Sequence, residues 1–359
     1  MPFPDLQSFV AALEERDQLR RVRVEVDPIL EAAEIADRVM KSDSPEGVDG
    51  APITDPVHGG KGGRALLFEN VRGSSVPLLM NAFGSYARIK LALGCDCLED
   101  LAARVQQLVK PEVPTTLLDK LKKLPDLAKL AGYSPKVVRR GICQEVVRTD
   151  DANLLDLPII QCWPHDGDLA SEPPYPVPEW YQNELLRRQD GGKPAGALST
   201  PSEIETRLGA TRTGRYITLA GIYTKDPDTG DRNVGMYRVQ VFGPKLAAMH
   251  WHMHHDGARH FRKWASRGQP MPIAIVLGGE SVLPYAATCP LPPTVSELLF
   301  AGFLNGTGIE IVPAKTVPLE VPANAEIVIE GLVDPVERFI EGPFGDHTGF
   351  YSLSAPYPV

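Results

Sequence analysis

The chain has 359 residues and a net charge of −9, with 43% apolar and 23% charged residues. This is the balance of a globular protein of about two domains. The acidic excess and the lack of a basic block argue against nucleic acid as the main partner. No run of about 18 apolar residues occurs, so we expect no membrane span.

The first residues, Met1–Asp5, do not have the pattern of a signal peptide. The five cysteines, an odd number, are scattered and include no CxxC pair. We therefore expect reduced thiols and a cytoplasmic protein.

The first 140 residues alternate predicted helices and strands. Asp5 is placed to cap a helix in which Leu6, Phe9, Val10 and Leu13 recur with the helical period. This alternation predicts an N-terminal α/β domain with a connector, residues 1–140. Further helices are predicted at 30–40, 85–93, 98–109 and 117–130, and strands at 22–26, 65–68 and 76–82.

From residue 141 to 359 strand patterns dominate, which predicts a β-rich barrel and an α+β fold overall. Residues 226–231 predict the loop of a hairpin. Residues 166–212 are rich in proline and glycine and are either a lid or a surface insert. Strands are predicted at 142–147, 216–224, 233–241, 273–277, 309–312 and 325–329, and helices at 258–266 and 296–304.

Glu341 and Asp346 stand on either side of Gly342, Pro343 and Gly345. Because glycine permits positive φ and proline fixes its own φ, the chain must bend here and is able to aim both acids at one point. Two acids at one point are a means of holding a proton near neutral pH. Taken alone, however, the stretch is more often a surface turn with two solvated acids.

Three other clusters have residue types suited to a site. Arg238 emerges among apolar neighbours in Asn233–Arg238, where it either meets a carboxylate or phosphate or reaches solvent at a strand edge. Four of the eight histidines fall within 250–255. They would either bind a metal ion, contact a phosphate when protonated, or simply line a surface. Glu297 is predicted at the start of a helix, where the helix dipole favours an acidic residue without any further role. Together with an asparagine and a histidine, however, its carboxylate would form a ligand set suited to Mn²⁺ or Mg²⁺.

These motifs together resemble the UbiD family. The similarity includes Asn233–Arg238, the His254 segment, the prolines before Glu297, and Glu341–Asp346. It extends to 77–85, 157–164, 321–323 and 326–331 and covers most of the chain outside 166–212.

The resemblance implies a split β-barrel flavin-binding domain and a reversible decarboxylase of aromatic or α,β-unsaturated acids. Its cofactor would be prenylated FMN, supplied by a separate flavin prenyltransferase, with Mn²⁺ and K⁺ at the phosphate. Arg238, Glu341 and Asp346 would be catalytic, with Asp346 as a proton donor of raised pKa. Metal ligands would be Asn233, His254 and Glu297, and main-chain oxygens near Val234, Ala286 and Cys289 would bind K⁺. The cofactor would be lined by Met236, Tyr237, Arg238, His250, Trp251, His252, His255 and Asp256.

The sequence departs from the family pattern in three ways that matter. The 166–212 excursion is longer than the family pattern implies and would reshape the substrate entrance. His250 and His255 stand where relatives often carry arginine, which puts phosphate binding in doubt; Arg259 or Arg262 would be the substitutes. Relatives also continue beyond the position of Val359 into a C-terminal domain that oligomerises the enzyme and helps to close the site. We therefore expect either a fragment or a shortened protein, and a homo-oligomer if full-length.

Two other functions remain open on the sequence. One is an ordinary FMN oxidoreductase on a similar barrel, which would not need Arg238, Glu341 and Asp346. The other is a non-catalytic flavin-binding or assembly protein.

Overall fold

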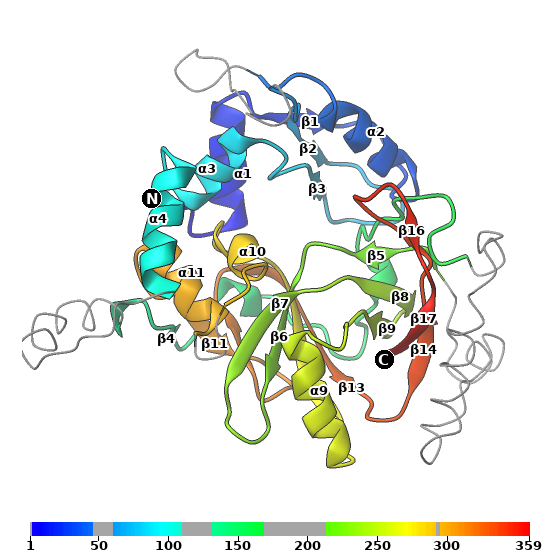
Figure 1. The fold of residues 1–359 in the computed structure, drawn as a ribbon. Coiled ribbons are helices and arrows are strands. Elements are labelled where there is room, and N and C mark those ends of the chain that lie inside the picture. Colours follow the sequence, from blue (N-terminus) through cyan, green and yellow to red (C-terminus); the bar gives the residue numbers. More distant parts are fainter. Residues whose placement is uncertain (1, 46–59, 110–130, 169–212, 292–294) are drawn as a thin grey trace, which may run out of the picture.

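The structure is a computed structural model that describes residues 2–45, 60–109, 131–168, 213–291 and 295–359. The helix predicted at 117–130 and nearly all of the 166–212 excursion lie outside these residues. The description therefore covers the ends of the chain and the segments that carry most of the site residues (Figure 1).

A three-stranded sheet organises the N-terminal part. Its middle strand β2 runs parallel to β1 and antiparallel to β3. Ala65 packs with helix α1 and Leu66 with helix α2, so the two helices cover opposite faces, since successive strand residues alternate. The elements are α1 (Leu6–Glu15), β1 (Leu19–Val22), α2 (Glu31–Met40), β2 (Ala65–Phe68), β3 (Leu78–Met80), α3 (Tyr86–Leu93) and α4 (Leu98–Val109).

Side-chain N-caps fix the first residue of two of these helices, at the positions that the sequence predicted. Asp5 accepts a hydrogen bond from the Ser8 amide at 2.7 Å and begins α1. Ser85 does the same for the Arg88 amide at 3.3 Å and begins α3. Each cap satisfies a backbone donor that has no partner inside the helix.

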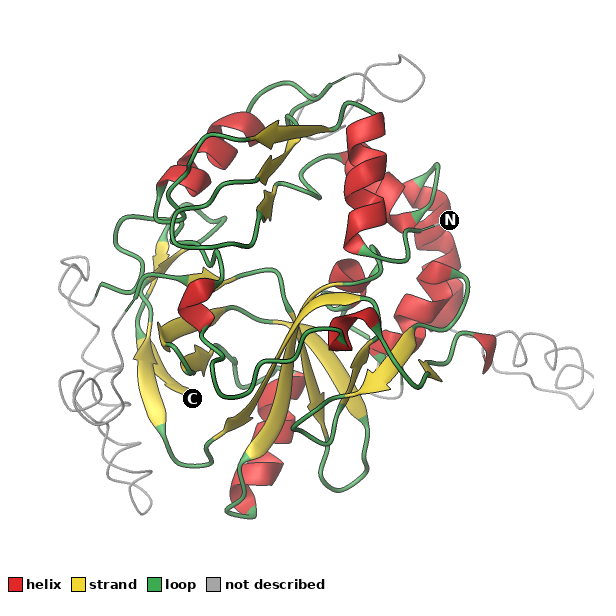
Figure 2. Cartoon of the chain, turned by 180° about the vertical axis from the view of Figure 1, so that it is seen from behind, coloured by secondary structure: helices red, strands yellow, loops and turns green. Residues whose placement is uncertain are grey.

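The rest of the described chain contains two main sheets. One has the strand order β13-β10-β6-β7 and the other β5-β8-β9. Seen from behind, these strands gather in the lower half of the view (Figure 2). Their strands are β5 (Tyr216–Ile217), β6 (Gly221–Lys225), β7 (Arg232–Met236), β8 (Val239–Gly243), β9 (Leu246–Met249), β10 (Met271–Gly278) and β13 (Ala325–Val333).

Shorter sheets and helices complete this part. The order β12-β11-β4 forms one small sheet, and the pairs β14-β17 and β15-β16 form two ribbons. The remaining elements are β4 (Lys136–Val137), η1 (Ile142–Gln144), η2 (Leu154–Asp156), α9 (Asp256–Ser266), α10 (Leu283–Ala286), α11 (Glu297–Asn305), β11 (Glu310–Pro313), β12 (Glu320–Pro322), β14 (Arg338–Glu341), β15 (Phe344–Gly345), β16 (Tyr351–Ser352) and β17 (Ala355–Pro358).

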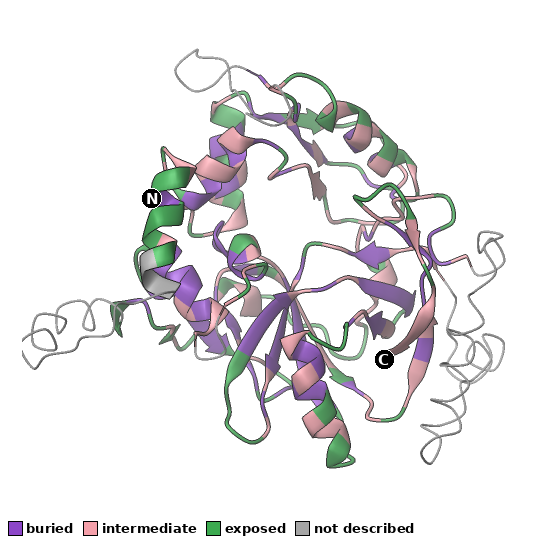
Figure 3. Cartoon of the chain, in the orientation of Figure 1, coloured by how far each residue is buried: buried purple, intermediate pink, exposed green. Residues whose placement is uncertain are grey.

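Buried residues link the two parts of the chain. Leu93, Leu101 and Tyr133 share one apolar cluster with residues of β6, β10 and α11. A second cluster packs β8 and β10 against α9, and Figure 3 shows the buried residues concentrated in these elements. The division near residue 140 stays a prediction.

Four predicted strands are wrong in detail. The strand predicted at 22–26 lies earlier, as β1 at Leu19–Val22, and Val24 is exposed outside it. Residues 142–147 contain a 3₁₀ turn, and Ile142, Val146 and Val147 are exposed, so no sheet uses their apolar pattern. The predicted strand 216–224 is two strands, β5 and β6, in different sheets. The predicted strand 233–241 is likewise divided between β7 and β8.

The predicted mixture of helices and sheets is confirmed, whereas the predicted β-barrel is not. The described strands pair into separate sheets and do not close on themselves. All five cysteines are free. In the described part of the chain, no helix is long and apolar enough to span a bilayer.

Candidate active site

Arg238 and Glu341 form a buried ion pair between two elements that are 103 residues apart. The Arg238 Nε donates to Glu341 Oε1 at 2.7 Å, and its Nη2 donates to Oε2 at 3.0 Å. The Glu341 side chain is fully buried, and that of Arg238 is 13% exposed. Nη2 also donates to Ser352 Oγ at 2.9 Å, and the guanidinium lies 4.5 Å from the Phe344 ring centre. The planar donor fork of arginine suits this two-point contact.

His250 is the second partner of Glu341. Its Nδ1 lies 2.8 Å from Glu341 Oε2. Burial acts to raise the pKa of Glu341, but the hydrogen bonds from His250 and Arg238 outweigh it and the pKa is lowered. Glu341 is therefore a carboxylate at neutral pH. The sequence expectation placed His250 against the cofactor, whereas here it contacts an acid.

Backbone contacts hold the turn that follows Glu341. Gly342 has φ 93°, a value that favours glycine, and its amide donates to Gln240 Oε1 at 2.9 Å. The Gly345 amide donates to Asp166 Oδ1 at 2.7 Å, while Asp166 Oδ2 accepts from the Trp163 amide at 2.8 Å. Asp166 and Gln240 are thus supports of the site that the sequence reasoning missed.

Signals for these missed residues were present but weak. Gln240 follows Arg238 by two residues, and a polar residue inside the apolar run 239–242 implies a buried partner. Asp166 lies two residues after the matched segment 157–164. Ser352 and Phe344, by contrast, meet Arg238 only through tertiary folding.

Asp346 does not join Glu341 as expected. It is partly exposed, and its Oδ1 accepts from the Thr348 amide at 2.8 Å and the Thr348 Oγ1 at 2.6 Å. Its pKa is lowered, chiefly by the Thr348 side-chain hydrogen bond. Among the described residues, no hydrogen bond joins Asp346 to Arg238 or Glu341. The expected raised pKa is therefore wrong, because a local turn supplies donors to the charged carboxylate.

Glu297 contacts strand β7 at the residue that follows Asn233. The Glu297 Oε2 accepts a hydrogen bond from the amide of Val234, the residue after Asn233, at 2.9 Å. Glu297 is the first residue of α11, and burial raises its pKa. Asn233 is buried on β7 opposite Thr224 of β6, to which its Nδ2 donates at 3.3 Å.

His254 is not tied to this pair. It is exposed in the segment between β9 and α9, and no hydrogen bond links it to Asn233 or Glu297 in the described residues. The same part of the chain holds no group of three His, Cys, Asp or Glu residues able to bind a metal. An amide oxygen and a buried carboxylate are nevertheless donors that fit Mn²⁺.

The other expected cofactor residues lie around Tyr237. The Tyr237 ring is 4.8 Å from that of His255 and 6.2 Å from that of Trp251. The indole Nε1 of Trp251 is buried without a partner in the described residues. Burial lowers the pKa of His255 and, to the extent that its ring is covered by neighbouring atoms, that of His252, although His252 is an exposed residue overall. Neutral imidazoles attract a phosphate more weakly than arginine would.

Met236 and Asp256 have backbone and ionic roles. The Met236 amide donates to the Ala287 carbonyl at 3.1 Å. This bond connects β7 to the C-terminal end of α10, whose last residue is Ala286. Asp256, at the start of α9, pairs with Arg259 at 2.9 Å. Arg259 is therefore already held by a carboxylate.

Family models match both parts of the chain. One describes the 3-octaprenyl-4-hydroxybenzoate carboxy-lyase N-terminal domain and matches residues 10–108. The other describes the Rift-related domain of the same enzyme and matches residues 210–359. The chain belongs to the UbiD family.

Relatives in the UbiD family extend the comparison. A protein of unassigned function from Aquifex aeolicus is 43% identical over 357 residues, which are 99% of this chain and 60% of that protein. The evolved dimeric UbiD-class enzyme HmfF from Pelotomaculum thermopropionicum, in complex with prFMN, is 28% identical with a TM-score of 0.68, over 99% of this chain and 63% of that one.

A second solved structure agrees. The vanillic acid decarboxylase of Sedimentibacter hydroxybenzoicus in closed form is 26% identical with a TM-score of 0.69, over 100% of this chain and 60% of that one. The chain thus spans about 60% of the length of the UbiD relatives that it matches.

Proposed function

We propose that this chain carries the cofactor site and the reacting acids of a reversible, non-oxidative decarboxylase of aromatic or α,β-unsaturated carboxylic acids. The observation that carries the proposal is the buried Arg238–Glu341 pair, flanked by His250. A fully buried carboxylate with two cationic or polar donors has no need to be there for folding, because apolar residues would pack as well. Its support from relatives is a UbiD-class enzyme bound to prFMN and a vanillic acid decarboxylase.

Prenylated FMN, when bound, would supply the sink for the electrons that CO₂ leaves behind. The chain would contribute the residues that line the cofactor, namely Met236, Tyr237, Arg238, His250, Trp251, His252, His255 and Asp256. We propose that the cofactor lies in a split β-barrel domain to which these residues belong. A flavin prenyltransferase would supply it.

Arg238 has the free donor needed to orient a substrate carboxylate. Its Nε and Nη2 are engaged by Glu341 and Ser352. Among the described residues nothing accepts from Nη1. An arginine that is fixed by one carboxylate and offers a further donor to a second one holds the substrate in a defined geometry.

Asp346 would be the proton donor to the carbon that loses CO₂. Because it is partly exposed, it takes up a proton from solvent before each turnover. Its lowered pKa makes the protonated form scarce at neutral pH, which favours acidic conditions for the decarboxylation direction.

Metal binding completes the proposal. Asn233, Glu297 and His254 would hold Mn²⁺, and main-chain oxygens near Val234, Ala286 and Cys289 would hold K⁺. Glu297 already contacts the amide of Val234, the residue after Asn233, and closure of the exposed His254 toward these residues would complete the set. Oligomerisation would belong to the whole protein.

Coexpression with a flavin prenyltransferase tests the proposal. Mass spectrometry should find prenylated FMN on the purified chain, and CO₂ exchange should appear with at least one acid of an aromatic and enoic panel. Glu341→Gln and Asp346→Asn should abolish exchange but keep the cofactor, while the exposed Glu310→Gln serves as the matched control. Unmodified FMN with NAD(P)H oxidation, or full exchange in both acid variants, would contradict it.

A further inference from the structure

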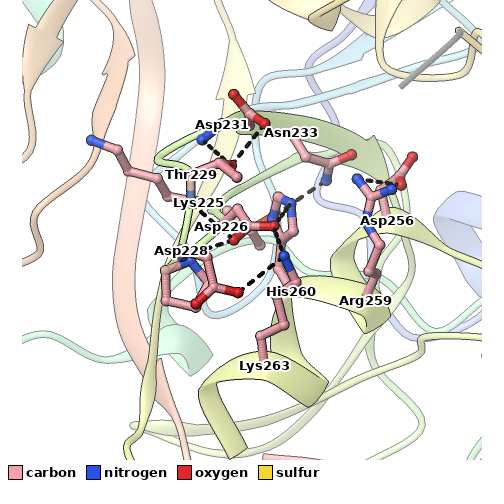
Figure 4. Close-up of polar contacts among 12 residues, drawn as sticks. Lys225, Asp226, Asp228, Thr229, Asp231, Asn233, Asp256, Arg259, His260 and Lys263 are labelled. Carbon is pink, nitrogen blue, oxygen red and sulfur yellow. Dashed lines mark hydrogen bonds and ion pairs between the residues drawn. The ribbon is translucent and has the colours of Figure 1, made fainter. Parts of the chain in front are cut away.

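A hydrogen-bonded row of side chains leads away from Asn233 on the β6–β7 hairpin. Thr224 and Asn233 are directly opposite each other in the antiparallel register, so their side chains share a face. The Asn233 Nδ2 donates to Thr224 Oγ1 at 3.3 Å, and both residues are buried. Figure 4 labels Asn233, at one end of this row, and His260 of helix α9, toward which the row leads.

His260 is the next member of the row. It projects from α9 with 1% exposure, and its Nδ1 lies 3.0 Å from Thr224 Oγ1. On its other side, Nε2 lies 3.9 Å from Asp226 Oδ2. The negative charge of Asp226 favours the proton on Nε2, which leaves Nδ1 to accept from the Thr224 hydroxyl. The hydroxyl proton then points to His260, and a lone pair of the oxygen points to Asn233.

Asp226 is fixed in place by its own contacts. Lys263 Nζ donates to its Oδ2 at 2.6 Å, and the Asp228 amide donates to Oδ1 at 2.9 Å. The hairpin loop is therefore clamped to α9, which carries both His260 and Lys263 (Figure 4). The row of side chains is anchored at the end far from Asn233.

The amide of Asn233 is oriented by this row and by one further residue. Besides Thr224, the Asn233 side chain interacts with the Tyr237 hydroxyl, and this interaction opposes the rise that burial causes in the pKa of Tyr237. The contact with Thr224 uses the amide nitrogen. No backbone amide of the described residues donates to the oxygen Oδ1, and oxygen is the atom that a divalent cation requires.

We propose that Thr224 and His260 are positioning residues that set the side chain of Asn233 for Mn²⁺. This inference rests on the proposed role of Asn233 as a metal ligand and adds its outer supports. A ligand oxygen that is fixed before the ion arrives loses no orientational freedom on binding. Partners of this kind typically contribute about 10- to 100-fold to metal affinity.

The test is a Mn²⁺ titration of the FMN-loaded protein, with free Mn²⁺ followed by electron paramagnetic resonance. Thr224→Val keeps the shape of the side chain but removes the hydroxyl, and it should weaken Mn²⁺ binding by about 10- to 100-fold. Thr224→Ser should restore wild-type affinity. His260→Leu removes the support from α9 independently and should weaken binding in the same direction.

Thr229→Val is the matched control on the same hairpin, because the Thr229 hydroxyl donates only to Asp231 at the loop, at 2.7 Å. It should bind Mn²⁺ as the wild type does. The thermal midpoint of each metal-free variant is measured separately. A Thr224→Val protein with a lower midpoint but unchanged Mn²⁺ affinity would show a purely structural role and overturn the inference.

Asn233→Ala separates this inference from the proposed function. Unchanged Mn²⁺ affinity in Asn233→Ala would overturn the metal site itself, and the positioning role with it. Weakened binding in Asn233→Ala, together with wild-type affinity in Thr224→Val and His260→Leu, would overturn the positioning role alone.

Discussion

Arg238 contacts both carboxylate oxygens of Glu341, a residue with no exposed surface. Removing one partner leaves the other as a buried charge without compensation, which is costlier than losing the pair. We expect Glu341→Ala to lower the free energy of unfolding by about 3–5 kcal/mol.

Urea denaturation measures this loss, and Glu34→Ala is its control. Glu34 forms an exposed ion pair with Arg38 one helical turn away. Such surface pairs contribute about 0.3–0.5 kcal/mol. Equal losses in the two variants would show that the buried pair has no special weight.

Thr348 should set the pH range of turnover through Asp346. Thr348→Val removes the hydroxyl that lies 2.6 Å from Asp346 Oδ1 and favours the charged form. The pKa of Asp346 should therefore rise toward its ordinary value. A general acid works only while protonated, so the fall in kcat/KM at high pH should move to higher pH.

The measurement for Thr348 is the pH profile of decarboxylation. Thr316→Val is the control, since the Thr316 hydroxyl donates to Glu330, away from Asp346. A shift to lower pH, or none, would contradict Asp346 as the proton donor.

Asp226 should make the free energy of unfolding depend on pH in the acidic range. Burial acts to raise its pKa, but the hydrogen bond from Lys263 and the turn amides lower it to about 2 from 3.8. Since the unfolded chain takes up the proton first, the stabilisation is complete above about pH 4 and is lost as the pH falls toward 2.

We expect Asp226→Asn to lose this contribution. Unfolding free energies measured from pH 6 to pH 2, roughly spanning both pKa values, should fall less steeply in the variant than in the wild type. Parallel curves for the two proteins would show that Asp226 is not responsible.

Gly345 has no room for a side chain. A Cβ built at this position would lie 2.1 Å from Cδ2 of the Trp163 ring. Gly345→Ala should therefore cost about 1–3 kcal/mol of unfolding free energy and move the turn that carries Asp346.

Thermal unfolding compares Gly345→Ala with Gly132→Ala. Nothing lies within 4 Å of a Cβ at Gly132. Gly132 is the last helical residue before a turn. The substitution should be neutral or stabilising, since alanine is favoured over glycine in a helix. A Gly345→Ala protein as stable as the wild type would mean that the ring of Trp163 moves freely.

Local features of the fold could be predicted from the sequence. Asp5 and Ser85 begin their helices because capping depends on neighbours three residues away. The strand 65–68 is confirmed without change as β2. The strand 216–224 was wrong because its two halves pair with different sheets, and a sequence pattern does not show which partner each half finds.

The site divides in the same way. Family resemblance named Arg238 and Glu341 together, and the structure brings them into contact across 103 residues. The contact of Asp346 with Thr348 was missed although the Asp-x-Thr spacing is local and typical of a turn. The links from Glu341 to His250 and from Thr224 to His260 arise only when distant elements pack.

Asp166 joins two loops through a single carboxylate. It accepts from the amides of Cys162 and Trp163 on one side and of Gly345, 179 residues later, on the other. A displacement of either loop must therefore be shared by its neighbour or break a buried hydrogen bond. The turn that contains Gly345 and the loop before residue 168 are therefore expected to move together, as one unit, rather than independently.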